Sequence, residues 1–134
     1  MCFLVACSSG GSKSRAQIES PQQIEDLTRA KADSENRLGM VYKGDAIRVS
    51  FKVGTARHPA GWWGERKTIG GVTGILGGVT YRNTMTLYTD PKTGNAAYCP
   101  MVHEMMRAVM YSNGMKDEAS QNAKLKAIKW GWCR

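Results

Sequence analysis

Three polar side chains interrupt an otherwise apolar segment that runs from Met101 to Tyr111. They are His103, Glu104 and Arg107, at positions i, i+1 and i+4 of a strong helical pattern. At about 100° per residue these positions fall within one stripe of a helix, so the three side chains project in the same direction. An imidazole and a carboxylate on one helix face can bind a metal ion or transfer a proton. The segment therefore predicts a largely buried helix that presents this trio to a cleft or to water.

Two further helices are expected around this central one. Pro21, placed directly after a serine, is typical of a helix start, and Ile24 and Leu27 begin an apolar stripe that we expect to end near position 36. Residues 117–128 form a second amphipathic stretch, with lysines on its solvent side.

Strands are predicted between the first and the central helix. Between positions 40 and 53 the period changes to strict alternation, which indicates a half-buried strand, and an antiparallel sheet with one wet face suits it. Residues 81–89 give a second strand, and residues 90–94 give a turn that contains Pro and Gly. The inward-facing residues of the first strand are expected to be Ile47, Val49, Phe51 and Val53.

Residues 54–66 are rich in Gly and Pro and are expected to form a loop. The loop carries His58, Trp62 and Trp63, which could form the wall of a binding cleft. Tryptophans in such a position more often cover the end of a core.

Residues 68–79 contain the sequence GGVT twice, starting at Gly70 and Gly77. No Gly-Lys-Ser/Thr follows, so the segment is not a phosphate-binding P-loop. Its four-residue glycine spacing resembles a glycine zipper between helices, whereas the Val and Thr residues between the glycines favour a loop or an irregular hairpin.

The order strand, turn, apolar helix with His-Glu resembles the zincin metallopeptidases. The resemblance covers MTLYTDPKTGNAAYCPMVHEMMRAVMYSNGMKDE, residues 85–118. In that family two histidines of a His-Glu-x-x-His helix bind zinc, and the glutamate polarises the metal-bound water. The resemblance implies a zinc-ligand role for His103 and a general-base role for Glu104. It also implies a downstream acidic ligand, for which Asp117 and Glu118 are the candidates, and His58 could supply another if its loop covers the cleft.

Arg107 stands where the family has its second histidine. A guanidinium has no lone pair to donate and stays protonated, so it cannot replace an imidazole as a ligand. Two readings of the resemblance follow: a degenerate zincin-like domain that acts as a binding or structural component, or an active zinc peptidase with a substitute ligand. A third interpretation needs no resemblance, because Glu104 and Arg107 could form a helical ion pair beside a satisfied His103.

The formal net charge is +8 and the sequence pI is near 9.5, which favours anionic partners. Phospholipid head groups, nucleic acid and acidic cell-wall polymers all qualify. The basic residues are scattered along the chain, which favours a solvated basic surface. A basic nucleic-acid-binding module is a further possibility, but Trp and Lys are not interleaved as stacking platforms require.

The first seven residues resemble the end of a bacterial lipoprotein signal peptide. The stretch Leu4-Val5-Ala6-Cys7 matches the lipobox, in which the cysteine is lipidated, although only six residues precede it and none is basic. We therefore expect a truncated signal over residues 1–7 and a flexible tether over residues 8–19. The resemblance implies a lipid anchor in the bacterial outer membrane on its periplasmic side, with envelope proteins or cell-wall polymer as partners. A secreted or periplasmic protein is the alternative.

If Cys7 carries lipid, Cys99 and Cys133 remain as an even pair in an oxidising compartment, and we expect a disulfide between them. Two buried thiols are the alternative. Residues 20–134 are then expected to form a single α+β domain. Its zincin-like architecture would combine an antiparallel or mixed sheet with a buried central helix and flanking helices.

Overall fold

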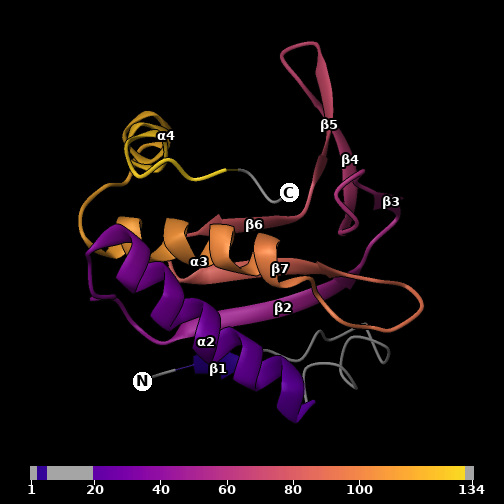
Figure 1. Cartoon of the computed structure of the whole chain (residues 1–134), viewed down its shortest axis with the longest axis horizontal. Helices are drawn as coiled ribbons and strands as arrows, with labels where there is room; N and C mark the ends of the chain where they lie inside the picture. Colours follow the sequence, from indigo (N-terminus) through magenta and orange to yellow (C-terminus); the bar gives the residue numbers. More distant parts are fainter. Residues whose placement is uncertain (1–2, 6–19, 132–134) are drawn as a thin grey trace.

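The computed structural model describes residues 3–5 and 20–131, and it has the expected α+β fold (Figure 1). In the described part of the chain, none of the helices has the length and apolar composition that crossing a bilayer requires. In chain order the elements are β1 (Phe3–Val5), α2 (Pro21–Leu38), β2 (Ile47–Val53), β3 (Ala56–Arg57), β4 (Trp63–Ile69), β5 (Val72–Leu76), β6 (Gly78–Tyr81), β7 (Thr84–Thr89), α3 (Tyr98–Ser112) and α4 (Glu118–Ala127).

The main sheet is mixed and has the strand order β1-β2-β7-β6. Strand β2 pairs with β7 in parallel, from Arg48 opposite Thr84 to Val53 opposite Thr89, and β6 pairs with β7 in antiparallel fashion. The expectation of a purely antiparallel sheet is therefore wrong, and the mixed sheet is confirmed. The reason lies in the connection, because the chain leaves β2 through the separate sheet β3-β4-β5 and returns along the far edge as β6.

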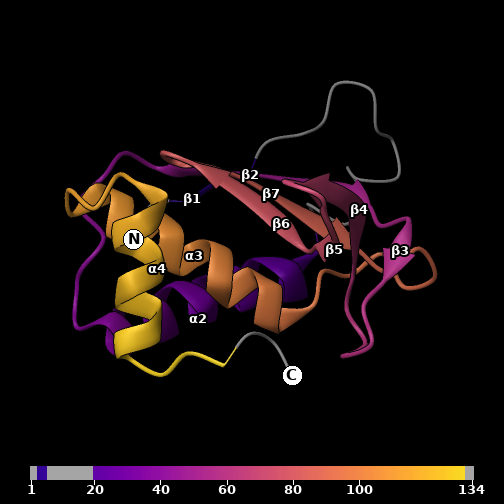
Figure 2. The same ribbon diagram turned by 90° about the horizontal axis from the view of Figure 1, so that it is seen from above.

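Figure 2 shows the helices on one side of the main sheet, with α3 packed against α2 and against strands β6 and β7. In β2 the predicted inward-facing residues Ile47, Val49 and Phe51 are buried, whereas Val53, the last residue of the strand, is 37% exposed. On α2, Leu27 is buried whereas Ile24 is 42% exposed, since Gln23 takes the inward position instead.

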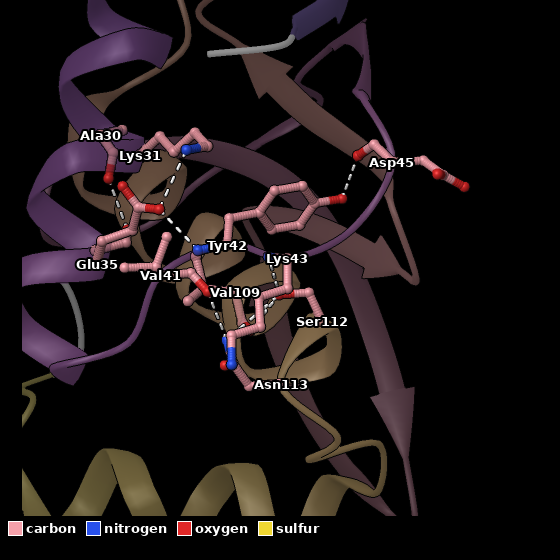
Figure 3. Close-up of polar contacts among 11 residues, drawn as sticks. Ala30, Lys31, Glu35, Val41, Tyr42, Lys43, Asp45, Val109, Ser112 and Asn113 are labelled. Atoms are coloured by element: carbon pink, nitrogen blue, oxygen red, sulfur yellow. Dashed lines mark hydrogen bonds and ion pairs between the residues drawn. The ribbon is translucent and has the colours of Figure 1, made fainter.

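The segment between α2 and β2 is fixed to both helices by polar contacts, which Figure 3 draws. Helix α2 runs to Leu38, two residues beyond the predicted end, and stops where Gly39 adopts a left-handed conformation with φ 65°. The carboxylate of Glu35 then accepts the backbone N–H of Tyr42 at 2.7 Å, and Asn113, which directly follows α3, donates its side-chain N–H to the Val41 carbonyl at 2.9 Å. These contacts hold residues 41 and 42 against α2 and the end of α3.

Residues 54–81 are more regular than the sequence suggested. The predicted loop contains β3 and the start of β4, which pair through Ala56 opposite Gly64. Strands β4 and β5 form a hairpin whose two-residue turn, Gly70-Gly71, has positive φ at both positions. A turn with positive φ at both positions matches the right-handed twist of a β-ribbon, and glycine adopts such angles without steric cost. The first GGVT is therefore a hairpin turn, and the expectation of a hairpin is confirmed with a regular geometry.

The second GGVT brings β6 close to α3. A Cβ atom on Gly78 would lie 2.6 Å from Cγ of Glu104 and 3.0 Å from the Thr86 carbonyl oxygen, and one on Gly77 would lie 2.9 Å from the ring of Trp62. Glycine is needed here for close approach rather than for its conformational freedom. The two copies of the repeat thus serve different physical needs.

The turn at residues 90–94 is confirmed. The Asp90 carboxylate accepts the backbone N–H of Lys92 at 2.7 Å, and Gly94 has φ 77°. Cys99, in the first turn of α3, is disulfide-bonded. Cys133 and Cys7 lie outside the described residues, so the pairing of Cys99 with Cys133 stays a prediction, as does lipidation of Cys7.

We predict that Gly78→Ala destabilises the fold by about 1 to 3 kcal/mol, because the added methyl group must displace Glu104 or the β7 backbone. Gly74→Ala is the matched control, since a Cβ at Gly74 meets nothing within 4 Å, and it should change the free energy of unfolding by less than about 0.5 kcal/mol. Urea denaturation of both variants measures the difference. Equal stability of the two variants would show that β6 does not approach α3 this closely.

Candidate functional site

A cleft of about 560 Å³ opens between the edge strand β6, helix α3 and the start of α4. Its walls combine residues of β6 with residues of the consecutive helices α3 and α4. The lining residues are Leu76, Gly78, Val79, Thr80, Tyr81, Arg82, His103, Glu104, Arg107, Tyr111, Lys116, Glu118 and Gln121. His103, Glu104 and Arg107 project together as predicted, and of the two alternatives, a cleft or water, the structure shows that they line a cleft.

Glu104 is buried at the wall of this cleft, with 3% of its surface exposed. The Thr80 hydroxyl of β6 donates a hydrogen bond to the Glu104 carboxyl oxygen Oε1 at 2.8 Å. Burial raises the pKa of Glu104, and the Thr80 hydrogen bond and the charge of Arg107 offset this only in part. A carboxyl group with a raised pKa holds its proton more readily than an exposed glutamate does.

His103 is 6% exposed and accepts a hydrogen bond at Nε2 from Nε–H of Arg107, at 3.1 Å. Burial, followed by the charge of Arg107, lowers the pKa of His103 to about 3. The imidazole is therefore neutral near pH 7, and its acceptor role at Nε2 places the ring proton on Nδ1. The 3.9 Å separation between Nε2 of His103 and Oε2 of Glu104 is accordingly not an ion pair.

Arg107 connects α3 to α4. Besides its contact with His103, the guanidinium donates to Oε1 of Gln121 at 2.9 Å and to Oδ1 of Asn122 at 3.2 Å. Among the described residues no ion pair joins Glu104 to Arg107, so the expected helical ion pair is wrong. The arginine side chain turns instead along the i, i+4 direction toward His103 and α4.

The structure brings only some of the candidate ligands together. Glu118, in the first turn of α4, lines the same cleft as His103 and Glu104. Asp117 is exposed and caps α4 by accepting the backbone N–H of Ser120 at 2.9 Å, and hydrogen bonds from that serine lower the pKa of Asp117. It is therefore a helix cap, and it does not line the cleft.

His58, Trp62 and Trp63 lie elsewhere. The rings of His58 and Trp62 are stacked, with centroids 4.2 Å apart and an interplanar angle of 7°. Trp62 is 4% exposed and its ring lies beside Gly77, while Trp63 is half-buried in β4. That these tryptophans cover the end of the core stays a prediction. None of the three lines the cleft.

The cleft residues that the sequence analysis did not single out include Thr80, Arg82, Lys116 and Gln121. Thr80 holds the Glu104 carboxyl, and Gln121 is placed by its own donation to the Met115 carbonyl at 2.8 Å. A threonine in a strand and a glutamine in a helix carry no distinctive signal. Only the close approach forced by Gly78 could have pointed to Thr80.

The described residues do not fit a catalytic zinc ion. Catalytic zinc usually takes three protein ligands, and His103 Nε2 is occupied by the Arg107 hydrogen bond. Among residues 3–5 and 20–131 there is no group of three or more His, Cys, Asp or Glu side chains placed to hold a metal ion. The guanidinium charge beside His103 would also repel a dication.

Comparison of the chain with protein-family models, with curated proteins and with solved structures finds no match.

We predict that His103 makes the protein acid-sensitive. The unfolded chain binds a proton at this histidine below about pH 6.5, whereas the folded chain binds it only near pH 3, so stability falls as pH falls through this window. The slope from this residue is at most about 1.4 kcal/mol per pH unit. His103→Gln keeps an acceptor for Arg107 and removes the titration, so its stability should fall less steeply.

Urea denaturation at several pH values, for the wild type and His103→Gln, measures the difference between the two curves. The raised pKa of Glu104 contributes to both proteins and cancels in that difference. Parallel curves would contradict the assignment of a buried, neutral His103.

Proposed function

We propose that this protein is a cell-envelope lipoprotein whose zincin-like cleft binds an extended peptide segment without hydrolysing it. One observation carries the proposal: Nε–H of Arg107 is donated to Nε2 of His103 at 3.1 Å. In a zincin that nitrogen would hold zinc. The positively charged guanidinium of Arg107 thus lies next to the imidazole of His103.

The partners of the guanidinium support this substitution. Its three hydrogen bonds go to neutral acceptors on His103, Gln121 and Asn122, which surround it much as ligands surround a cation. A guanidinium cannot polarise a bound water as a metal ion does, because it has no vacant coordination position.

The edge strand supports a peptide as the ligand. Within the described residues β6 pairs only with β7, and its other edge borders the cleft. An extended segment can add to such an edge through backbone hydrogen bonds. Val79 and Tyr81 are 45% and 65% exposed on the same strand and can contact alternate side chains of the segment.

The charges of the cleft favour an acidic segment. Arg82 and Lys116 line it together with Arg107, against the single carboxylate of Glu118 and the buried Glu104. Arg82 lies 5.1 Å from the ring centroid of Tyr81, which places its charge at the cleft wall. No carboxylate among the described residues pairs with Arg107, so its charge is available to a ligand.

The proposed location depends on the leader. Phe3–Val5 of the expected signal forms β1 beside β2, so cleavage before Cys7 would remove β1 and leave β2 at the sheet edge. The disulfide at Cys99 is in keeping with an oxidising compartment.

We predict that the protein binds a fluorescein-labelled Val-Glu-Val-Glu-Val-Glu peptide more tightly than the matching Val-Lys peptide. Lys116→Gln should weaken binding of the acidic peptide about two- to fivefold, as expected for one partly exposed charge. Lys126→Gln, an exposed change on α4 outside the cleft lining, should leave it unchanged. Fluorescence anisotropy gives the Kd values. Equal affinity for the two peptides, or cleavage of either, would refute the proposal.

The alternative is an active zinc peptidase with a substitute ligand, and one observation favours it: Glu118 lines the same cleft as His103 and Glu104. That reading requires stoichiometric zinc in the wild-type protein. It also requires peptide hydrolysis that Glu104→Gln abolishes and metal binding that Glu118→Ala removes.

Metal analysis of Arg107→His distinguishes the two. We expect little zinc in the wild-type protein and about one zinc per chain in Arg107→His, because the new imidazole restores the i, i+4 histidine pair. Arg107→Gln is the control, since it removes the guanidinium without adding a nitrogen ligand, and it should bind little zinc. Zinc in the wild type at a 1:1 ratio would favour the peptidase, and no zinc in Arg107→His would count against a zincin-like geometry.

A further inference from the structure

The β4–β5 hairpin extends away from the rest of the molecule, as Figure 1 shows, and it ends in two aliphatic residues. Ile69 and Val72 are 75% and 73% exposed, more than the other large hydrophobic residues in the described part of the chain. They are cross-strand partners on either side of the turn Gly70-Gly71. This hairpin tip, defined as residues 69–72, takes no part in the cleft.

The hairpin tip is held by regular structure. Five residue pairs join β4 to β5 in register, and the two glycines close the ribbon in a turn that suits its twist. The hydroxyl groups of Thr68 and Thr73, the next pair along, are hydrogen-bonded to each other at 2.7 Å. The ribbon therefore presents an apolar pair at a fixed distance from the body of the protein.

Basic residues follow the apolar tip. Arg66 and Lys67 are exposed, and Lys67 pairs with Glu65 at 3.2 Å, while Glu65 also accepts the Tyr88 hydroxyl at 2.6 Å. In the described part of the chain Arg66 makes no ion pair, so its charge is available to an external anion.

We propose that the β4–β5 hairpin tip inserts into the surface of an anionic lipid bilayer, with Ile69 and Val72 in the acyl boundary and Arg66 and Lys67 among the lipid phosphates. A strand rises about 3.3 Å per residue, so Lys67 and Arg66 lie roughly 7 and 10 Å behind Ile69. The head-group layer of a bilayer leaflet is about 5 to 8 Å thick. The spacing of apolar and basic residues along β4 therefore matches the depth profile of a membrane surface.

A bilayer fits this tip better than a folded partner does. A stable protein interface needs about 800 Å² from each partner in a complementary shape, and two side chains on a narrow ribbon offer far less. A bilayer needs no shape complementarity, and it adds an attraction for each basic residue near its surface. The proposal does not depend on the function of the cleft, nor on lipidation of Cys7.

Vesicle co-sedimentation tests the proposal. The full chain with Cys7→Ser, which excludes an acyl group at that position, is mixed with vesicles of phosphatidylcholine alone or with about one third phosphatidylglycerol. We expect clear binding to the anionic vesicles and weak binding to the neutral ones. Ile69→Ser/Val72→Ser should lower the partition coefficient on anionic vesicles at least about tenfold, and Arg66→Gln/Lys67→Gln should remove the preference for anionic lipid.

Val41→Ser is the matched control, because Val41 is 65% exposed and lies in the α2–β2 connection, and it should bind as the parent does. Circular dichroism checks that each variant is folded.

In addition, Val72→Trp should gain a blue-shifted emission component with anionic vesicles, beyond any shift of the parent protein. Failure of the parent to bind anionic vesicles, or unchanged binding by Ile69→Ser/Val72→Ser, would overturn the proposal. A concentration-dependent dimer that Ile69→Ser/Val72→Ser abolishes, without vesicle binding, would assign the tip to self-association instead.

Discussion

Helix α3 is buried between α2 and the main sheet, so a buried polar side chain that it carries, such as that of Glu104, needs a partner inside the protein. The sheet meets this need from one side, because Gly78 lets β6 approach closely enough for Thr80 to reach the Glu104 carboxyl. Helix α4 supplies a partner on the other side, because Oε1 of Gln121 accepts a hydrogen bond from the guanidinium of Arg107. The burial of α3 thus explains why an edge strand and a C-terminal helix converge on one short stretch of side chains, and the cleft lies where they meet.

The same burial sets the chemistry of the site. In water a histidine, a glutamate and an arginine would all be charged or close to titration near neutral pH, but desolvation favours the neutral forms of the first two. Arg107 keeps its charge in any case, because a guanidinium cannot be deprotonated in a protein. The arrangement can bind and orient an anionic group. The three side chains do not offer the set of lone pairs that a zinc site needs. For this reason we interpret the site as a binding cleft and not as a peptidase active site.

Much of the fold could be predicted from the sequence. The alternation in β2, the proline before α2 and the Asp90 turn have local causes, and the i, i+1, i+4 spacing placed the trio on one face of α3. The parallel pairing of β2 with β7 could not be predicted, since it depends on the route that the chain takes through β3 to β6. Asp117 shows the same limit, because a carboxylate directly before a helix can be a ligand or a cap, and only its distance to Ser120 decides. Two of the three hydrogen-bond partners of Arg107, Gln121 and Asn122, lie 14 and 15 residues away, and no local pattern connects them to it.

The central claim is that Arg107 holds the His103 nitrogen that a metal ion would otherwise take. Nitrogen-15 NMR of the His103 imidazole tests it most directly, because the chemical shifts of the two ring nitrogens report which one is protonated. We expect a neutral ring with its proton on Nδ1 from about pH 5 to pH 8, unchanged when Zn²⁺ is added. A proton on Nε2, or a shift of the Nε2 resonance on addition of Zn²⁺, would contradict the account.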